Sequence, residues 1–202
     1  NILEGGKELS DDSSSRDRLI WTCRMFEQLG DEVDLKTRQD ILTDCHCSYP
    51  LRDLLDVKMD YRVNGDIDRV LVMLQKKFEN FLREVLELDH EMVQKIRELG
   101  WGLAGRREGD SIIATKIPKS SYLLAYFEEE DPDKKRKLYC HCPRVRDEVG
   151  SEPKIPLEYC YCGAGFYKGI WEEILGDEVE VEMAQSVMQG DEVCRIIVHL
   201  PK

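Results

Sequence analysis

The chain has 202 residues, of which 42% are hydrophobic and 35% are charged, and its net charge is −12. This acidic balance excludes a general nucleic-acid binder, because phosphate binding needs a basic field. No stretch approaches the ~18 to 20 apolar residues of a membrane-spanning helix, and no secretory signal is evident. We therefore expect a cytoplasmic protein that binds neither nucleic acid nor membrane.

The first hundred residues are typical of helices. Residues 1–15 are polar and rich in Gly and Ser, which indicates a flexible segment. Apolar residues recur at helical spacing over residues 16–100, and Asp34 and Asp66 are suited to cap two of the helices. The helix after Asp66 has the clearest apolar face, formed by Ile67, Val70, Leu71, Leu74, Phe78, Phe81, Leu82 and Val85.

The sequence pattern changes after Gly100, from one typical of helices to one typical of strands. Residues 109–118 and 120–130 are short and rich in Ile, Leu and Tyr, which predicts two strands of a hairpin or meander. Residues 138–143 are expected to continue the sheet. A helix is predicted over residues 163–176, and the alternating segment that follows, with a turn at "QGDE", predicts a terminal hairpin.

This order of elements predicts an α+β fold in which a helical N-terminal half packs on an antiparallel sheet. A chain of this length is suited to one large domain or two small ones. We expect the helical region at 16–100 and the α+β, ligand-binding-like region at 101–202 to form one continuous domain.

Six of the eight cysteines fall into three Cys-x-Cys pairs. The pairs are Cys45 and Cys47, Cys140 and Cys142, and Cys160 and Cys162. In a reducing compartment such thiols indicate metal ligation or redox chemistry before disulfides. Thiolates are soft donors suited to zinc, copper(I) and iron–sulfur centres. The two later pairs are separated by 17 intervening residues, which is similar to the spacing of a zinc ribbon.

A Cys-x-Cys pair can chelate one ion only where its backbone is bent. In an extended strand the two side chains lie about 7 Å apart, whereas the sulfurs around a tetrahedral zinc, with bonds of about 2.3 Å, lie much closer. Pro143 and Gly163 directly follow the two later pairs and permit such a bend. His46 and His141, in the middle of two pairs, are interpreted as solvent-facing, with ligation through a bent loop as the alternative.

Three accounts of the paired thiols stay open. In the favoured account the two later pairs hold one structural zinc, with the upstream pair nearby as a second or alternative arm. In the second, several pairs converge on an iron–sulfur or multinuclear cluster, since six thiolates exceed what one zinc needs. In the third, the cysteines bind no metal. Cys23 and Cys194 are flanked by core-like residues and are interpreted as packing residues.

Residues 165–201 resemble a known family. The helix "GIWEEILG", the acidic strand "EVEVE", the turn at Gly190 and Asp191, and the "CRIIV" strand around Cys194 are similar to the end of the 4-vinyl reductase type small-molecule-binding domain. They also resemble the related bacterial proteins named after aminothiazoline-carboxylate hydrolase. The resemblance implies an α+β fold in the superfamily of the haem-based nitric-oxide sensors, a small hydrophobic or aromatic ligand, and a cysteine-based metal site. That family's pattern has a cysteine where this chain has Ser186, so we expect a metal site here to use the Cys-x-Cys pairs.

These observations predict a cytoplasmic protein that binds a metal through cysteines, with zinc favoured, and binds or senses a small molecule. A hydrolase is the first alternative, in which a metal-bound water or a thiolate such as Cys160 or Cys162 attacks, with His141 as base and Glu158 or Glu172 as acid. An iron–sulfur or redox protein is the second, and a homodimer is one option for the assembly. Candidates for lining the ligand pocket, with core packing as the alternative, are Tyr159, Tyr161, Phe166, Tyr167 and Trp171.

Overall fold

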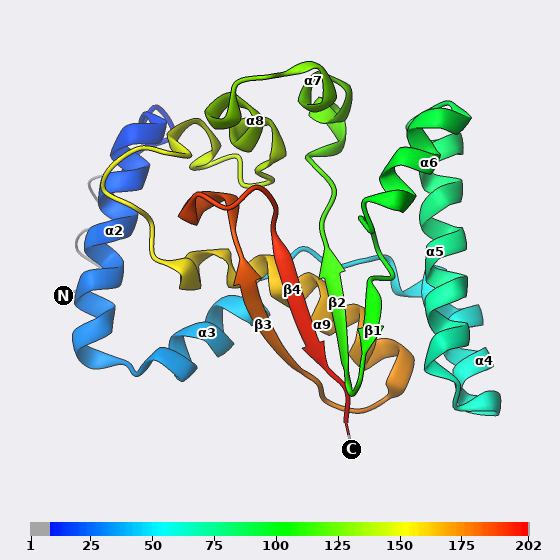
Figure 1. The fold of residues 1–202 in the computed structure, drawn as a ribbon. Helices are drawn as coiled ribbons and strands as arrows, with labels where there is room; N and C mark the ends of the chain where they lie inside the picture. The colour runs from blue at the N-terminus through cyan, green and yellow to red at the C-terminus, as the bar shows by residue number, and fades with distance from the viewer. Residues whose placement is uncertain (1–8, 202) are drawn as a thin grey trace.

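A computed structural model describes residues 9–201 of the chain. The fold is α+β, as predicted, with a helical N-terminal half followed by a mixed region that carries an antiparallel sheet (Figure 1). The helices are α2 (Ser15–Glu32), α3 (Leu35–Asp44), α4 (Leu55–Asn64), α5 (Ile67–Glu84), α6 (His90–Glu98), α7 (Leu123–Glu128), α8 (Pro132–Tyr139) and α9 (Tyr161–Leu175). The strands are β1 (Arg106–Glu108), β2 (Ser111–Thr115), β3 (Glu180–Gln185) and β4 (Arg195–His199). Short 3₁₀ turns are η2 (Leu51–Leu54), η3 (Ser120–Tyr122), η4 (Arg146–Glu148), η5 (Leu157–Cys160) and η6 (Val187–Gln189).

Local sequence determines where the N-terminal helices begin. Ser14 caps α2 and forms a capping box with Asp17. Asp34 caps α3 and Asp66 caps α5, each accepting hydrogen bonds from the backbone of the first turn, as predicted. Of the expected flexible segment 1–15, the first eight residues lie outside the described part of the chain, and the last residue begins α2.

The sheet has the strand order β1-β2-β4-β3, and all its pairs are antiparallel. Burial alternates along the strands, because successive side chains point to opposite faces. The buried face is formed by Ile112, Ala114, Met183, Ile196 and Val198. The predicted terminal hairpin is confirmed, since β3 and β4 are neighbours in the sheet.

Helix α9 lies behind the sheet in Figure 1 and also packs against α3 and α4. Its buried residues lie on several sides of the helix, which is typical of a helix enclosed by the core. The approach of α3 is close at Gly165, where any Cβ would overlap the backbone carbonyl of Thr43. Only glycine fits there, so Gly165 brings the end of α3, and the Cys45–Cys47 segment after it, against α9.

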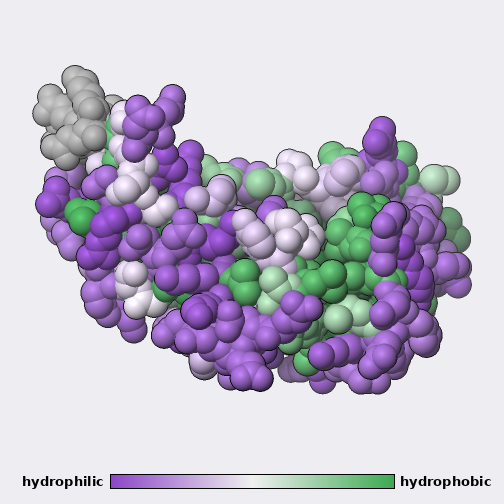
Figure 2. Space-filling model, turned by 90° about the horizontal axis from the view of Figure 1, so that it is seen from above, coloured by the Kyte–Doolittle hydropathy of each residue, from purple (hydrophilic) through white to green (hydrophobic). Residues whose placement is uncertain are grey.

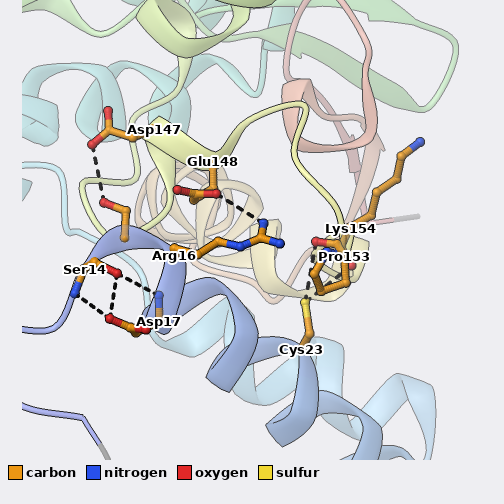
Figure 3. A network of polar contacts seen from close by, with 9 residues as sticks. Ser14, Arg16, Asp17, Cys23, Asp147, Glu148, Pro153 and Lys154 are labelled. Atoms are coloured by element: carbon orange, nitrogen blue, oxygen red, sulfur yellow. Dashed lines mark hydrogen bonds and ion pairs between the residues drawn. The ribbon is translucent and has the colours of Figure 1, made fainter.

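Helix α2 packs against the segment that connects η4 to η5 (Figure 3). Arg16 forms an ion pair with Glu148 at 3.5 Å, and the buried Cys23 donates from its thiol to the Lys154 carbonyl oxygen at 3.6 Å. These contacts connect the N-terminal helix to the loop between the two later Cys-x-Cys pairs.

Two strand predictions are wrong. Residues 120–130 form η3 and α7, with Leu123 and Tyr126 buried at helical spacing. Residues 138–143 form the end of α8 and the loop after it, so the first of the later cysteine pairs does not belong to the sheet. The short apolar runs fitted a strand as well as a helix, and packing against Trp101 and Tyr139 decided for the helix.

Hydrophobic and hydrophilic residues are distributed unevenly over the surface. Figure 2, which views the molecule from the α7–α8 side, shows hydrophobic surface gathered toward α5 and α6 and mainly hydrophilic surface toward α2. Within residues 9–201, none of the helices combines the length and the hydropathy that crossing a membrane requires.

Candidate functional site

Three different elements of the fold carry the two later Cys-x-Cys pairs and Cys194. Cys140 is the residue at which α8 ends, and Cys160 ends η5 directly before α9. Cys194 directly precedes β4, and its carbonyl accepts a hydrogen bond from the Lys116 backbone at 3.0 Å. Because β2 and β4 are paired, the end of β2 lies beside Cys194.

The Cys140–Cys142 segment is held against the end of β2 by two side chains. The Tyr139 hydroxyl donates to the Lys116 carbonyl oxygen, and His141 Nε2 lies 2.8 Å from the Ile117 carbonyl oxygen. Tyr139 is fully buried. This anchoring positions the segment beside Cys194 although more than fifty residues separate the two in sequence.

Three thiols form an inner group: Cys140, Cys160 and Cys194. Burial raises the pKa of Cys160 well above its usual value, and the charges of Cys194 and Cys140 raise it further. Burial also raises the pKa of Cys140 to about 12, again with a contribution from Cys194. Because charge interactions weaken with distance, these contributions indicate that Cys140 and Cys160 each lie within interaction range of Cys194. The buried Ser186 hydroxyl donates to Cys160 Sγ at 3.2 Å.

Two thiols form an outer group beside them: Cys142 and Cys162. Burial raises the pKa of Cys162, and the charges of Cys142 and of Cys47 raise it further. The Tyr159 hydroxyl lies 3.6 Å from Cys142 Sγ. Cys47 of the upstream pair therefore reaches the outer group. Cys45 is exposed, and its thiol has no hydrogen-bond partner among the described residues.

Each later pair thus divides its two sulfurs between the inner and the outer group. Cys160 ends a 3₁₀ turn and Cys162 lies in the first turn of α9, where residues two apart are rotated by about 200° around the helix axis. Pro143 and Gly163 were expected to permit a bend at each pair, and at the second pair the chain is helical. Gly163 is an ordinary residue of α9, and the helix itself separates the two thiols.

Positively charged side chains surround the thiols of this acidic protein. Lys116 lowers the pKa of Cys162 and of Cys194, although burial raises both. Arg146 lowers the pKa of Cys140 in the same way and donates to the Cys140 carbonyl oxygen at 2.7 Å. Neither of these cations forms an ion pair with the carboxylates of residues 9–201. They favour negative charge on the sulfurs.

The two histidines of the pairs have different surroundings. Burial lowers the pKa of His141 to about 4, so the ring is neutral at pH 7, and the interpretation of His141 as solvent-facing is wrong. Because its Nε2–H donates to Ile117, its Nδ1 keeps a free lone pair. His46 is half-buried, with its Cε1 atom 3.1 Å from the position of a Cβ on Gly169.

In the described part of the chain, no three His, Cys, Asp or Glu side chains are arranged to hold a metal ion. The thiols are neighbours, but they do not form a ready-made set of metal ligands. The donor set itself fits a soft cation, because it offers several thiols and a neutral imidazole.

The profile of one protein family, described as "Family of unknown function (DUF6144)", matches residues 86–202. The chain belongs to this family. No curated protein and no solved structure matches the chain.

The DUF6144 region contains both the inner and the outer thiols, together with Lys116 and Ser186. The Cys45–Cys47 pair and helices α2–α5 lie before it. The inner and outer thiols therefore lie within the region that the family model matches.

Sequence reasoning missed three members of the site. Cys194 was interpreted as a packing residue, but it lies in the inner group with Ser186 and beside Lys116. The available signals were the single lysine that ends the apolar run "SIIATKIP" and the resemblance around Cys194. Both signals are weak without knowledge of the strand pairing.

The residues proposed for hydrolysis are engaged elsewhere. Glu158 pairs with Arg38 at 3.0 Å, and Glu172 pairs with Lys168 at 2.7 Å. The raised pKa values of Cys160 and Cys162 oppose a thiolate nucleophile, which needs a lowered pKa.

The aromatic residues around α9 have several roles. Tyr159 contacts Cys142, whereas Tyr167 and Trp171 are buried in the core, with the Tyr167 hydroxyl donating to the Gly102 carbonyl oxygen at 2.9 Å. Phe166 stacks edge-on against Tyr49. Tyr161 alone among the five pocket candidates lines one of the two best-formed cavities of the described residues, an open polar hollow of about 450 Å³ between α3, α9 and β3.

Proposed function

We propose that this chain is a metal-binding protein that holds a soft cation, with zinc favoured, through the thiols of the Cys140–Cys142 and Cys160–Cys162 segments. Cys194 and Cys47 supply further sulfurs, and the metal stabilises a domain that binds or senses a small molecule. The observation that carries the proposal is the gathering of thiols from three distant segments beside cations that have no carboxylate partner.

The charge balance supports ligation rather than simple packing. Neutral buried thiols need no neighbouring cation, because they carry no charge to compensate. A metal site with several thiolates carries net negative charge, and Lys116 and Arg146 are placed to offset it. The protein as a whole has a net charge of −12, yet these cations lie beside the sulfurs without acidic partners among the described residues. Their placement indicates a site in which the sulfurs bind the metal as negatively charged thiolates.

Cation binding would also reconcile the two groups of thiols with the raised pKa values. A soft cation binds the deprotonated thiol and so releases its proton. The inner group offers Cys140, Cys160 and Cys194, and the outer group offers Cys142 and Cys162. Small movements at the end of α8 and at the start of α9 would select four of these sulfurs.

Metal content and colour test the proposal. Protein purified without oxygen and without chelators is expected to contain ~1 zinc per chain by elemental analysis. The double variant Cys140→Ser/Cys160→Ser should lose most of this metal. Cys45→Ser is the matched control, because Cys45 belongs to the same kind of pair but is exposed and outside the two groups; it should keep the metal.

The alternatives give distinct results. A brown protein with iron and sulfide in place of zinc would establish the iron–sulfur reading of the same thiols. Wild-type protein with negligible metal of any kind, or a double variant that keeps the full metal content, would overturn the proposal.

A further inference from the structure

A larger cavity of about 720 Å³ lies between α6, α7, α8 and the β3–β4 connection, and its lining residue Trp101 meets Tyr139 edge-on. Its volume is within the range of small-molecule sites. Its lining residues include Lys95, Trp101, Tyr126, Phe127, Lys135, Gln185 and Arg195. None of these residues belongs to the proposed metal site.

Flat apolar surface forms one wall of this cavity. The Trp101 ring stacks on Phe127 with centroids 5.8 Å apart and meets Tyr126 edge-on at 5.7 Å. Trp101 and Tyr126 are 6% and 8% exposed, so the packing of the core holds both rings. Such a wall favours a flat, apolar ligand body.

Polar groups of the same residues lack partners. The Trp101 indole N–H and the Tyr126 hydroxyl form no hydrogen bond with the described residues, and both atoms keep accessible surface although the rest of each side chain is largely buried. The side-chain oxygen of Gln185 is buried and also has no partner in that part of the chain. The buried Gln185 oxygen can accept a hydrogen bond, and the two accessible donors can each give one. The cavity wall therefore offers two donors to a ligand that carries hydrogen-bond acceptors.

The charged residues at the cavity indicate the charge of a ligand that would bind there. Lys95 lies 4.4 Å from the centroid of Phe127, and Lys135 lies 5.0 Å from that of Tyr126. Neither lysine, nor Arg195, forms an ion pair with the described residues. Of the two acidic residues in the lining, Asp191 already accepts a hydrogen bond from the Ser186 backbone at 2.8 Å. Glu192, the other acidic residue, has no ion-pair partner among the described residues, and its charge contributes to raising the pKa of Tyr126. Within that part of the chain, three unpaired cations therefore face one unpaired carboxylate at this cavity.

We infer that this cavity binds a planar organic anion, of the class of an aromatic carboxylate, with its ring against Trp101 and Tyr126 and its carboxylate toward Lys95 and Lys135. The Tyr126 hydroxyl and the Trp101 N–H supply hydrogen bonds to the ligand oxygens. This inference does not rest on the metal proposal, because none of the residues that carry it is a proposed metal ligand.

Binding of 2-naphthoate to the full chain, measured by isothermal titration calorimetry, tests the inference. We expect saturable binding that is at least tenfold tighter than that of the neutral 2-naphthylmethanol, with no binding of the cationic 2-naphthylmethylamine. Raising the salt concentration should weaken the carboxylate complex, because the lysine charges are partly exposed.

Two variants separate this cavity from other apolar surfaces. Tyr126→Phe removes only the unpaired hydroxyl and should weaken 2-naphthoate binding roughly tenfold, as expected for a hydrogen bond to a charged group. Lys95→Gln/Lys135→Gln should weaken it by at least as much and reduce its salt dependence. Tyr122→Phe is the matched control, because Tyr122 is exposed on the neighbouring η3 turn and does not line the cavity; its binding should equal that of the wild type.

Three results would overturn the inference: no saturable binding of 2-naphthoate at millimolar concentration, equal binding of the amine, or equal affinities of Tyr126→Phe and Tyr122→Phe. Since the titration is repeated on chelator-treated protein, loss of the metal proposal and loss of this one remain distinguishable.

Discussion

Substituting Gly165 by alanine tests how the upstream cysteine pair is brought to the site. An added Cβ would overlap the Thr43 carbonyl oxygen, and it would lie 2.8 Å from the Thr43 carbonyl carbon and 3.0 Å from His46 Cβ. The first two are backbone atoms, which cannot rotate away. The end of α3 and the segment that carries Cys47 must therefore move outward from α9.

The neighbouring Gly163 provides a control within the same helix. Its added Cβ would meet only the ends of two flexible side chains, Met183 Cε at 3.4 Å and Lys116 Nζ at 3.5 Å. Replacing glycine by alanine in a helix stabilises it by up to about 1 kcal/mol, so Gly163→Ala should be neutral or slightly stabilising. Overpacking typically costs about 1–3 kcal/mol. Gly165→Ala should therefore be less stable than Gly163→Ala by about 2–4 kcal/mol.

Urea denaturation followed by circular dichroism measures both variants, and a thermal scan should separate their midpoints by roughly 4 to 16 °C for a chain of this size. Gly165→Ala should also make Cys47 react faster with a thiol reagent, because its segment is displaced. If Gly165→Ala is as stable as Gly163→Ala, α3 does not approach α9 as closely as the structure has it, and the placement of Cys47 beside Cys162 is lost with it.

Two further predictions concern charge and thiol burial. A hydrogen bond from Arg97 lowers the pKa of the buried Glu79 to about 2, below its ordinary 4.5, so Glu79 stabilises the α5–α6 pair above pH 4.5 and loses this effect as the pH falls toward 2. The pKa difference corresponds to a stabilisation of at most about 3 kcal/mol, and nearer 1–2 kcal/mol because Arg97 is half-exposed. The difference in stability between the wild type and Glu79→Gln should therefore shrink between pH 7 and pH 3. An unchanged difference would contradict the assignment. In chelator-treated native protein, Cys45 should react quickly with 5,5′-dithiobis(2-nitrobenzoate) and the buried Cys140 only after denaturation, as mapped by peptide mass spectrometry; equal rates would refute the burial of Cys140.

The sequence by itself determined the features that depend on local physics. The caps at Asp34 and Asp66, the helix that became α9 and the β3–β4 hairpin follow from hydrogen-bonding side chains and from periodicities of 3.6 and 2. The α+β class follows from the order of these elements. Spacing also picked out six paired cysteines, from Cys45 to Cys162; no three of them form a metal-holding group in the described residues, and metal binding stays a prediction.

Only the tertiary structure decided how those cysteines are arranged. Whether a short apolar run becomes α7 or a strand depends on its partners, which lie far away in sequence. The same is true of Cys194, which reaches the inner thiols because β4 pairs with β2, and of the approach of α3 to Gly165. Spacing in sequence shows which thiols are available. At the start of α9 the two sulfurs of the pair face different ways, because side chains two residues apart on a helix point to opposite sides.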